Sequence, residues 1–158
     1  MNDEIKVPVS VPLDADGFLR RECPTCEEEF KWFNHAEGDP DAEQVDQYFC
    51  PRCGQAAGAD SWWTPAQLDY AHGAAAPAID DFINDALDDA FKGFKNSKYL
   101  KVTRTGRYSS ETPIPEPLHE PNDMVIVEPP CHPNEPVKVP EGAAGQVYCL
   151  ICGSLFAA

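Results

Sequence analysis

The sequence lacks long hydrophobic runs and contains few basic residues. No stretch approaches the about 18 consecutive apolar residues that a membrane-spanning helix requires, so we expect no membrane segment. Lys and Arg number 12 against 27 Asp and Glu, which gives a formal net charge of −15. A chain with this charge is repelled by phosphate backbones overall. The net negative charge therefore disfavours nucleic-acid binding.

Recognisable catalytic motifs are also missing. The glycine-containing stretch 142–145 has no lysine or helix after it, so it does not match a phosphate-binding loop. The zinc-deaminase pattern is absent, because Pro133 and Asn134 follow His132 where the pattern requires His-x-Glu. The other histidines lie in acidic or loop contexts without a partner nucleophile: His35, His72 and His119. We therefore predict that the chain is not an enzyme.

Signals of secretion are missing as well. The charged start, Met1-Asn2-Asp3-Glu4, is followed by no apolar run, and the number of cysteines, seven, is odd. A secreted disulfide framework normally has an even number of cysteines behind a signal peptide. A redox dithiol normally uses one Cys-x-x-Cys at the start of a helix, not three in loops. These features predict reduced cysteines and a cytoplasmic location.

The cysteines that are present follow a strict pattern. Six of them form three Cys-x-x-Cys pairs, and the seventh, Cys131, directly precedes His132. Such a turn brings two sulfurs to one ion, and Zn²⁺ binds four ligands in a tetrahedron. The first two pairs therefore predict one four-thiolate metal site, formed by Cys23, Cys26, Cys50 and Cys53.

The third pair, Cys149 and Cys152, needs two further ligands. Cys131 and His132 are the nearest candidates upstream, and His119 is an alternative to His132 because adjacent ligands are geometrically tight. The sequence thus predicts a second site and two zinc ions per chain. Four thiolates also suit iron, so iron in the first site remains an alternative.

Two short segments resemble the zinc-ribbon family, in which knuckles at the tips of β-hairpins bind one zinc ion. The residues that carry the resemblance are Cys23-Pro24-Thr25-Cys26 and Cys50-Pro51-Arg52-Cys53-Gly54. Glu27 stands where glycine is common in that family. The ending Cys149-Leu150-Ile151-Cys152-Gly153 is similar to the same knuckle. The resemblance implies two ribbons stabilised by metal, with rubredoxin-like turns.

The second and third knuckles also resemble each other. Each has an aromatic residue before its first cysteine, Phe49 or Tyr148, and a glycine after its second, Gly54 or Gly153. A degenerate repeat and convergence on one workable turn both explain this similarity. Trp62-Trp63 is a candidate for an exposed protein-binding pair or for a cover over the first site.

A helical region is predicted between the ribbons, over residues 62–95. Thr64 is a good N-cap with Pro65 after it, and we expect this first helix to stop at Gly73. A second helix is predicted after Pro77. Its apolar residues recur with helical spacing and are expected to form a core against the ribbon or a partner: Ile79, Phe82, Ile83, Ala86, Leu87, Ala90, Phe91 and Phe94.

Six basic residues follow at every third position, and a strand is predicted over residues 99–104. This segment, 92–107, contains no acidic residue and is interleaved with Tyr99 and Tyr108. It is the basis for an alternative function, nucleic-acid binding. The simpler explanation is a solvated face or an internal counterweight to the acids. The bases are Lys92, Lys95, Lys98, Lys101, Arg104 and Arg107.

The expected fold is therefore a small α+β protein stabilised by metal. We expect an N-terminal ribbon over residues 1–60, a helical segment with a basic strand over 61–110, a Pro-rich linker over 111–122 and a C-terminal ribbon over 123–158. Metal sites would compensate for the small cores of such short domains. The predicted function is that of a zinc-binding adaptor that contacts a protein partner.

Overall fold

A computed structural model describes residues 4–94, 98–100 and 103–158. The chain divides into two compact units. The first comprises Met1–Ser10 and Leu68–Pro117, and the second comprises Val11–Gln67 and Leu118–Ala158. We call them the helical unit and the ribbon unit.

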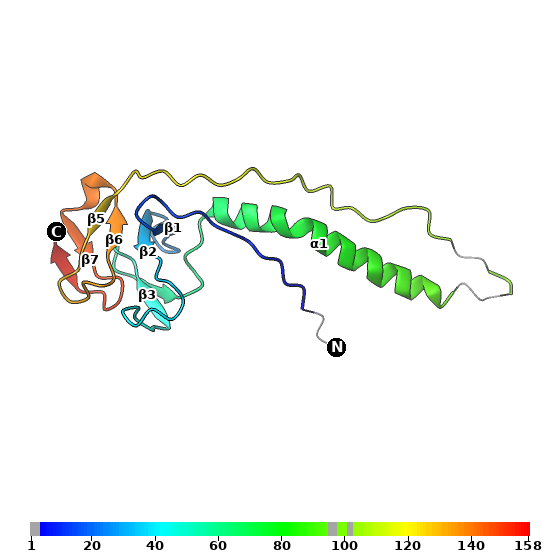
Figure 1. Cartoon of the computed structure of the whole chain (residues 1–158), viewed down its shortest axis with the longest axis horizontal. Coiled ribbons are helices and arrows are strands. Elements are labelled where there is room, and N and C mark those ends of the chain that lie inside the picture. Colours follow the sequence, from blue (N-terminus) through cyan, green and yellow to red (C-terminus); the bar gives the residue numbers. More distant parts are fainter. Residues whose placement is uncertain (1–3, 95–97, 101–102) are drawn as a thin grey trace. The chain divides into compact units, whose positions relative to one another are not determined.

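The ribbon unit contains an antiparallel sheet of four strands (Figure 1). Its strands lie in the order β1 (Phe18–Glu22), β2 (Glu29–Phe33), β6 (Val137–Val139) and β5 (Val125–Val127). The two central strands, β2 and β6, place Lys31 opposite Lys138. The sheet therefore joins strands from the segments predicted as the first and last ribbons. The boundaries of the four predicted segments stay a prediction.

Two smaller hairpins complete this unit. β3 (Gln47–Phe49) pairs with β4 (Ala56–Gly58), and β7 (Gln146–Tyr148) pairs with β8 (Leu155–Ala157). A short 3₁₀ helix, η1 (Glu141–Ala143), precedes β7. The predicted ligands lie in the loops that connect β1 to β2, β3 to β4, β5 to β6 and β7 to β8. Each metal-ligand group is thus held between two hairpins, as the zinc-ribbon resemblance implies.

Aromatic side chains form the core of the ribbon unit. Trp62 and Phe30 are fully buried, with ring centroids 5.7 Å apart and nearly perpendicular planes. Trp32 lies 6.4 Å from Trp62. Trp62 is therefore a core residue, whereas its neighbour Trp63 is exposed.

A single helix, α1 (Pro65–Lys92), spans the region in which two helices were predicted. Two reciprocal hydrogen bonds of 3.1 Å confirm its predicted start. The backbone N–H of Thr64 donates to the side chain of Gln67, and the backbone N–H of Gln67 donates to the side chain of Thr64. The predicted break at Gly73 and Pro77 is wrong, because Pro77 lies inside the helix. Three alanines, residues 74–76, favour helix there. Gly73 instead allows close packing, since a Cβ atom at this position would lie 3.1 Å from the Pro115 ring.

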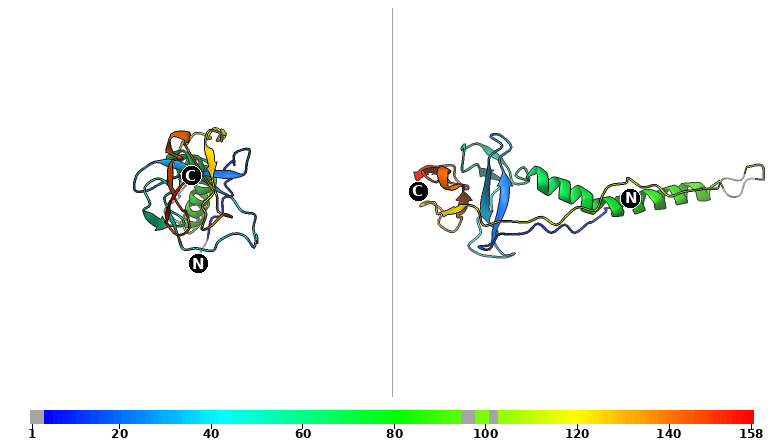
Figure 2. Two further views of the ribbon diagram at one scale, coloured as in Figure 1. Left: turned by 90° about the vertical axis from the view of Figure 1, so that its left-hand side faces the viewer. Right: turned by 90° about the horizontal axis from the view of Figure 1, so that it is seen from above.

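An extended segment, residues 103–117, runs beside α1 in the helical unit (Figures 1 and 2). The buried side chain of Asn84 holds it, because Asn84 accepts a hydrogen bond from the Tyr108 amide and donates one to the Tyr108 carbonyl. The strand predicted over 99–104 falls partly on residues 101 and 102, which lie outside the described residues. Its described positions carry no strand: Tyr99, Leu100, Thr103 and Arg104.

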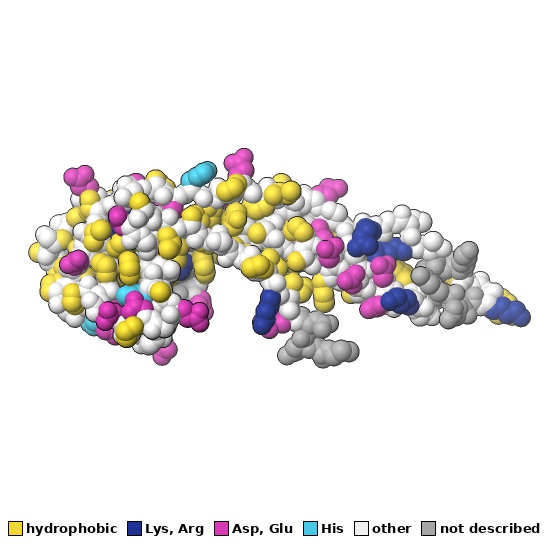
Figure 3. Space-filling view, viewed as in Figure 1, with side chains coloured by type: hydrophobic (Ala, Val, Ile, Leu, Met, Phe, Trp, Pro, Cys, Tyr) yellow, Lys and Arg dark blue, Asp and Glu magenta, His cyan; other side chains and the backbone are white. Residues whose placement is uncertain are grey.

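The apolar stripe of α1 is not buried in a core. Large side chains remain about two-fifths exposed at Ile79 and Phe82, and Phe94, two residues beyond the end of α1, is 54% exposed. Figure 3 shows hydrophobic side chains on the visible surface of this unit. Within the helical unit the described part of this stripe is therefore only partly covered, and residues 4–6 line a cavity together with Phe82. None of the described helices has the length and apolar character needed to cross a membrane.

Candidate metal centres

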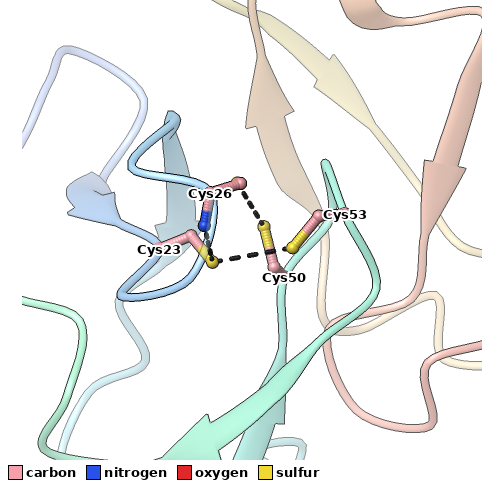
Figure 4. A group of neighbouring side chains, drawn as sticks. All are labelled: Cys23, Cys26, Cys50 and Cys53. Carbon is pink, nitrogen blue, oxygen red and sulfur yellow. Dashed lines mark hydrogen bonds between the residues drawn. The ribbon is translucent and has the colours of Figure 1, made fainter.

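The four predicted ligands of the first site lie together (Figure 4). The sulfur atoms of Cys23 and Cys53 are 3.7 Å apart, and those of Cys26 and Cys50 are 3.8 Å apart. All four sulfurs lie within 4.8 Å of one another. Cys23 and Cys50 are buried, and the other two are partly buried. Two hairpins that are distant in sequence therefore supply one enclosed group of thiols.

Backbone hydrogen bonds build each of the three knuckles in the same way. The amide four residues after the first cysteine donates to the carbonyl of that cysteine, and the cysteine amide donates to the carbonyl five residues later. The first set of bonds measures 2.9, 2.8 and 2.9 Å and joins Glu27 to Cys23, Gly54 to Cys50 and Gly153 to Cys149. These turns fix the sulfur positions through local geometry.

Glu27 adopts the backbone conformation that the other two knuckles give to glycine. Its φ is 59°, close to the 77° of Gly54 and the 73° of Gly153. A non-glycine residue in this left-handed region is strained by about 1 kcal/mol or more. The first knuckle therefore forms the usual turn despite its departure from the family pattern.

The first group fits a tetrahedral zinc ion. Sulfurs about 2.3 Å from zinc would be separated by about 3.8 Å along each edge of the tetrahedron, and the two S–S distances above match that value. Amides also point at the sulfurs: those of Thr25 and Arg52 lie 3.3 Å from Cys23 and Cys50, respectively. Such donors stabilise thiolates. Iron has similar ligand chemistry, so the geometry indicates a metal site without naming the metal.

The second group contains Cys131, His132, Cys149 and Cys152. The sulfurs of Cys131 and Cys152 are 3.4 Å apart, and the Cys149 sulfur is 3.4 Å from Nδ1 of His132. Cys131 and His132, although adjacent in the sequence, therefore both place a ligand atom in this one group. The alternative ligand, His119, lies outside this group, beside a small cavity lined by Val11 and other residues.

The two groups differ in exposure. In the second, Cys131 and Cys152 are exposed and only Cys149 is buried, whereas no cysteine of the first group is exposed. The Ser154 hydroxyl, 3.2 Å from the Cys152 sulfur, lowers the pKa of this thiol to about 6. Burial raises the pKa of the Cys149 thiol to about 12. A metal would have to displace the proton from Cys149, as coordination of a thiol does.

Reciprocal contacts interlock the second and third knuckles. The Phe49 amide donates to the Leu150 carbonyl at 2.8 Å, and the Tyr148 amide donates to the Pro51 carbonyl at 3.0 Å. The Tyr148 ring lies over Gly54, and the Phe49 ring lies over Gly153. The similarity between these segments is thus a structural symmetry, in which each knuckle binds the other by equivalent atoms.

Two buried lysines lie at the centre of the sheet, and no sequence pattern predicted their role. Lys31 and Lys138 lie opposite each other, and both Nζ atoms contact Oδ2 of Asp14, at 3.1 and 2.8 Å. Glu120 lies 2.9 Å from Lys31, and Asp16 lies 2.6 Å from Lys138. Each lysine lies between two apolar residues in its strand, and this shared pattern in β2 and β6 is the sequence signal that could have identified the pair.

Arg20 extends this ion-pair network to the end of the Pro-rich segment. It contacts Glu29 at 2.8 Å, Glu120 at 2.9 Å and Asp123 at 2.7 Å. Lys31 also donates to the Pro121 carbonyl at 2.6 Å. The end of the predicted linker 111–122 is therefore attached to the sheet, through Glu120 and Pro121.

Comparison of the chain with protein-family models, with curated proteins and with solved structures found no match. The arrangement of the cysteines is consistent with two metal sites of the zinc-ribbon kind.

Proposed function

We propose that this chain is a non-enzymatic zinc protein that binds two ions and acts by contacting a protein partner. The observation that carries the metal part is the convergence of two groups of four ligands, each within 4.8 Å. Four protein ligands complete a tetrahedron and leave no position for a substrate or a reactive water. Closed sites of this kind stabilise small folds.

The exposed stripe of α1 supports a role in protein contacts. Phe82 and Leu87 are exposed to 43% and 36%, and Ile79 to 44%. Large apolar side chains grouped on one face are a feature of protein-binding surfaces. Asp85 and Asp89 flank this stripe, so a partner segment with apolar and basic side chains would complement it.

A comparison of two tagged baits tests the partner proposal. We expect the wild-type chain to retain a partner that a Phe82→Glu, Leu87→Glu double variant does not retain, while both chains keep the same zinc content. A control variant, Glu116→Gln, changes an acid outside the stripe. Equal capture by all three chains, or no capture by any, would reject the α1 stripe as the contact surface.

Nucleic-acid binding by residues 92–107 is the alternative, and the ion pairs of the helical unit weigh against it. Arg104 lies 2.8 Å from Asp88, and Lys92 lies 2.7 Å from Asp89. Arg107 lies 3.9 Å from Asp81. In Figure 3, basic and acidic side chains alternate on this part of the surface. Lys95 and Lys101 lie outside the described residues.

Titration with single-stranded and duplex nucleic acid at two salt concentrations separates the two functions. The adaptor proposal predicts no saturable binding. Binding that weakens steeply with salt, and that is lost when Lys98, Lys101 and Arg104 are changed to Glu, would favour the alternative.

A further inference from the structure

Arg21, in β1, lies between two tryptophans. Its guanidinium carbon is 4.3 Å from the ring centre of Trp32 and 4.3 Å from that of Trp63. The side chain belongs to a residue that is only 8% exposed. Stacking on indole faces is favourable for a guanidinium, and its planar edge remains available for hydrogen bonds.

Arg21 has no counter-ion among the described residues. Its Nε atom is buried and has no hydrogen-bond partner within the described part of the chain. Every other arginine of the sequence contacts an acid: Arg20, Arg52, Arg104 and Arg107. A buried charge without a counter-ion is costly. In a chain with a net charge of −15, the absence of an acid beside Arg21 is therefore unusual.

A cavity of about 440 Å³ in the ribbon unit adjoins this arginine. Trp32 and Tyr48 line it, and their ring centroids are 4.7 Å apart. Leu150 contributes a further apolar surface. Aromatic walls with a convergent charged group are features of small-molecule sites. The lining also includes His35 and four acids: Glu37, Asp39, Glu43 and Glu135.

His35 and two of the acids that line the cavity form ion pairs. His35 lies 2.9 Å from Asp39 through Nδ1 and 3.0 Å from Glu135 through Nε2. Glu135 also accepts a hydrogen bond of 2.8 Å from the Glu43 amide. Asp39 and Glu135 are therefore occupied by His35, and they are not the missing partners of Arg21.

The charges around the cavity restrict the anion that it could accept. Glu37 and Glu43 are exposed lining residues, and they would repel a doubly charged phosphate more than a singly charged group. A carboxylate matches the planar fork of a guanidinium. The aromatic walls favour a flat apolar body behind it.

We propose that this cavity binds an aromatic monocarboxylate, with the carboxylate on the guanidinium of Arg21 and the ring against the aromatic wall at Trp32 and Tyr48. The carboxylate could belong to a free aromatic acid or to the C-terminal aromatic residue of a peptide. The chemistry is the same in both cases. This site does not depend on the identity of the bound metals or on the partner of α1.

The test observes the arginine Nε–Hε resonances of the full chain by NMR while ligands are added. Benzoate should move the Arg21 resonance saturably, and benzamide, its neutral analogue, should not. The Arg21 resonance is assigned by through-bond NMR correlations in the wild-type chain. The result therefore does not require a folded variant of Arg21. N-acetylphenylalanine and its amide test the peptide source, and inorganic phosphate tests the dianion.

Variants give a second readout. Arg21→Gln should weaken benzoate binding at least about tenfold, because it removes a charge-assisted pair. Arg21→Lys should also weaken it, since the charge stays but the fork is lost. Arg107→Gln, a change at an exposed arginine, should leave binding unchanged. The proposal is overturned if no carboxylate moves the Arg21 resonance, if folded Arg21→Gln binds benzoate as tightly as wild type, or if phosphate binds more tightly.

Discussion

The ring of Phe49 occupies the space beside Gly153 that a side chain would need. A Cβ atom on Gly153 would lie 2.6 Å from this ring, and one on Gly54 would lie 2.8 Å from the ring of Tyr148. Real Cβ atoms essentially never approach another heavy atom this closely. The aromatic residue of each knuckle therefore requires the glycine of the other, which explains why the two segments share both features.

We predict that Gly153→Ala destabilises the chain more than Gly38→Ala does. Both glycines have positive φ, 73° and 79°, so both variants introduce similar backbone strain, about 1–2 kcal/mol. Gly38 has no atom within 4 Å of its added Cβ, whereas Gly153 has the Phe49 ring. Overpacking should cost a further about 1–3 kcal/mol. Denaturant unfolding of the zinc-loaded proteins measures the difference, and equal losses would contradict the interlocked arrangement.

Glu27→Gly should stabilise the chain. Glycine adopts positive φ without the steric strain that Glu27 bears, and strain relief of about 1 kcal/mol would exceed the added entropy of the unfolded chain. Glu27→Ala removes the same carboxylate but keeps the strain, so it separates conformation from charge. Unfolding midpoints in urea give the comparison. The proposed turn would be rejected if Glu27→Gly were no more stable than Glu27→Ala.

Asp14→Asn should destabilise the sheet by at least about 2 kcal/mol, because it removes the carboxylate shared by two buried lysines. Burial alone would raise the pKa of Asp14. Hydrogen bonds from Lys138, the Phe18 amide and Lys31 outweigh burial and hold this pKa well below its usual 3.8. A lowered folded-state pKa gives stability that is present above about pH 4 and is lost as the pH falls. Asp41→Asn, at an exposed acid, is the control, and equal effects of the two variants would reject the network.

His35 should contribute stability at low pH and lose it as the pH rises. Burial lowers the pKa of His35, but the hydrogen bond to Asp39 and the charge of Glu135 outweigh it and raise the pKa above 6.5. A raised folded-state pKa gives stability that is complete below the unfolded value and declines through the folded value. The ring proton shifts of His35 in an NMR titration measure this directly. A midpoint at or below 6.5 would contradict the paired geometry.

Local patterns predicted the ligands and the start of α1, because each depends on a few neighbouring residues. Thr64 and Gln67 form a cap that can be recognised within four positions. The contact between Lys31 and Lys138 depends on the pairing of β2 with β6, which no local pattern specifies. The break predicted at Pro77 failed for a different reason, since strong helix formers on its N-terminal side outweigh one proline.

The apolar stripe of α1 shows a further limit of sequence patterns. Helical spacing identifies which residues share a face, but it does not say what covers that face. Phe82 would be a core residue by pattern, yet it is 43% exposed in the chain. The stacking of Arg21 could not be predicted from the sequence either. Trp63 follows the fully buried Trp62, and only the fold brings Trp63 over Arg21 in β1.

The central claim is that two groups of four ligands each hold one zinc ion, and elemental analysis of the purified chain tests it most directly. Protein from unsupplemented medium should contain two zinc ions per chain. A chelator should remove the ion of the second group first, because Cys131 and Cys152 are exposed. Cys53→Ser should lose the first ion and unfold the ribbon unit, whereas Ser61→Ala should keep both ions. One zinc ion per chain, iron in place of zinc, or oxidised thiols without metal would contradict the account.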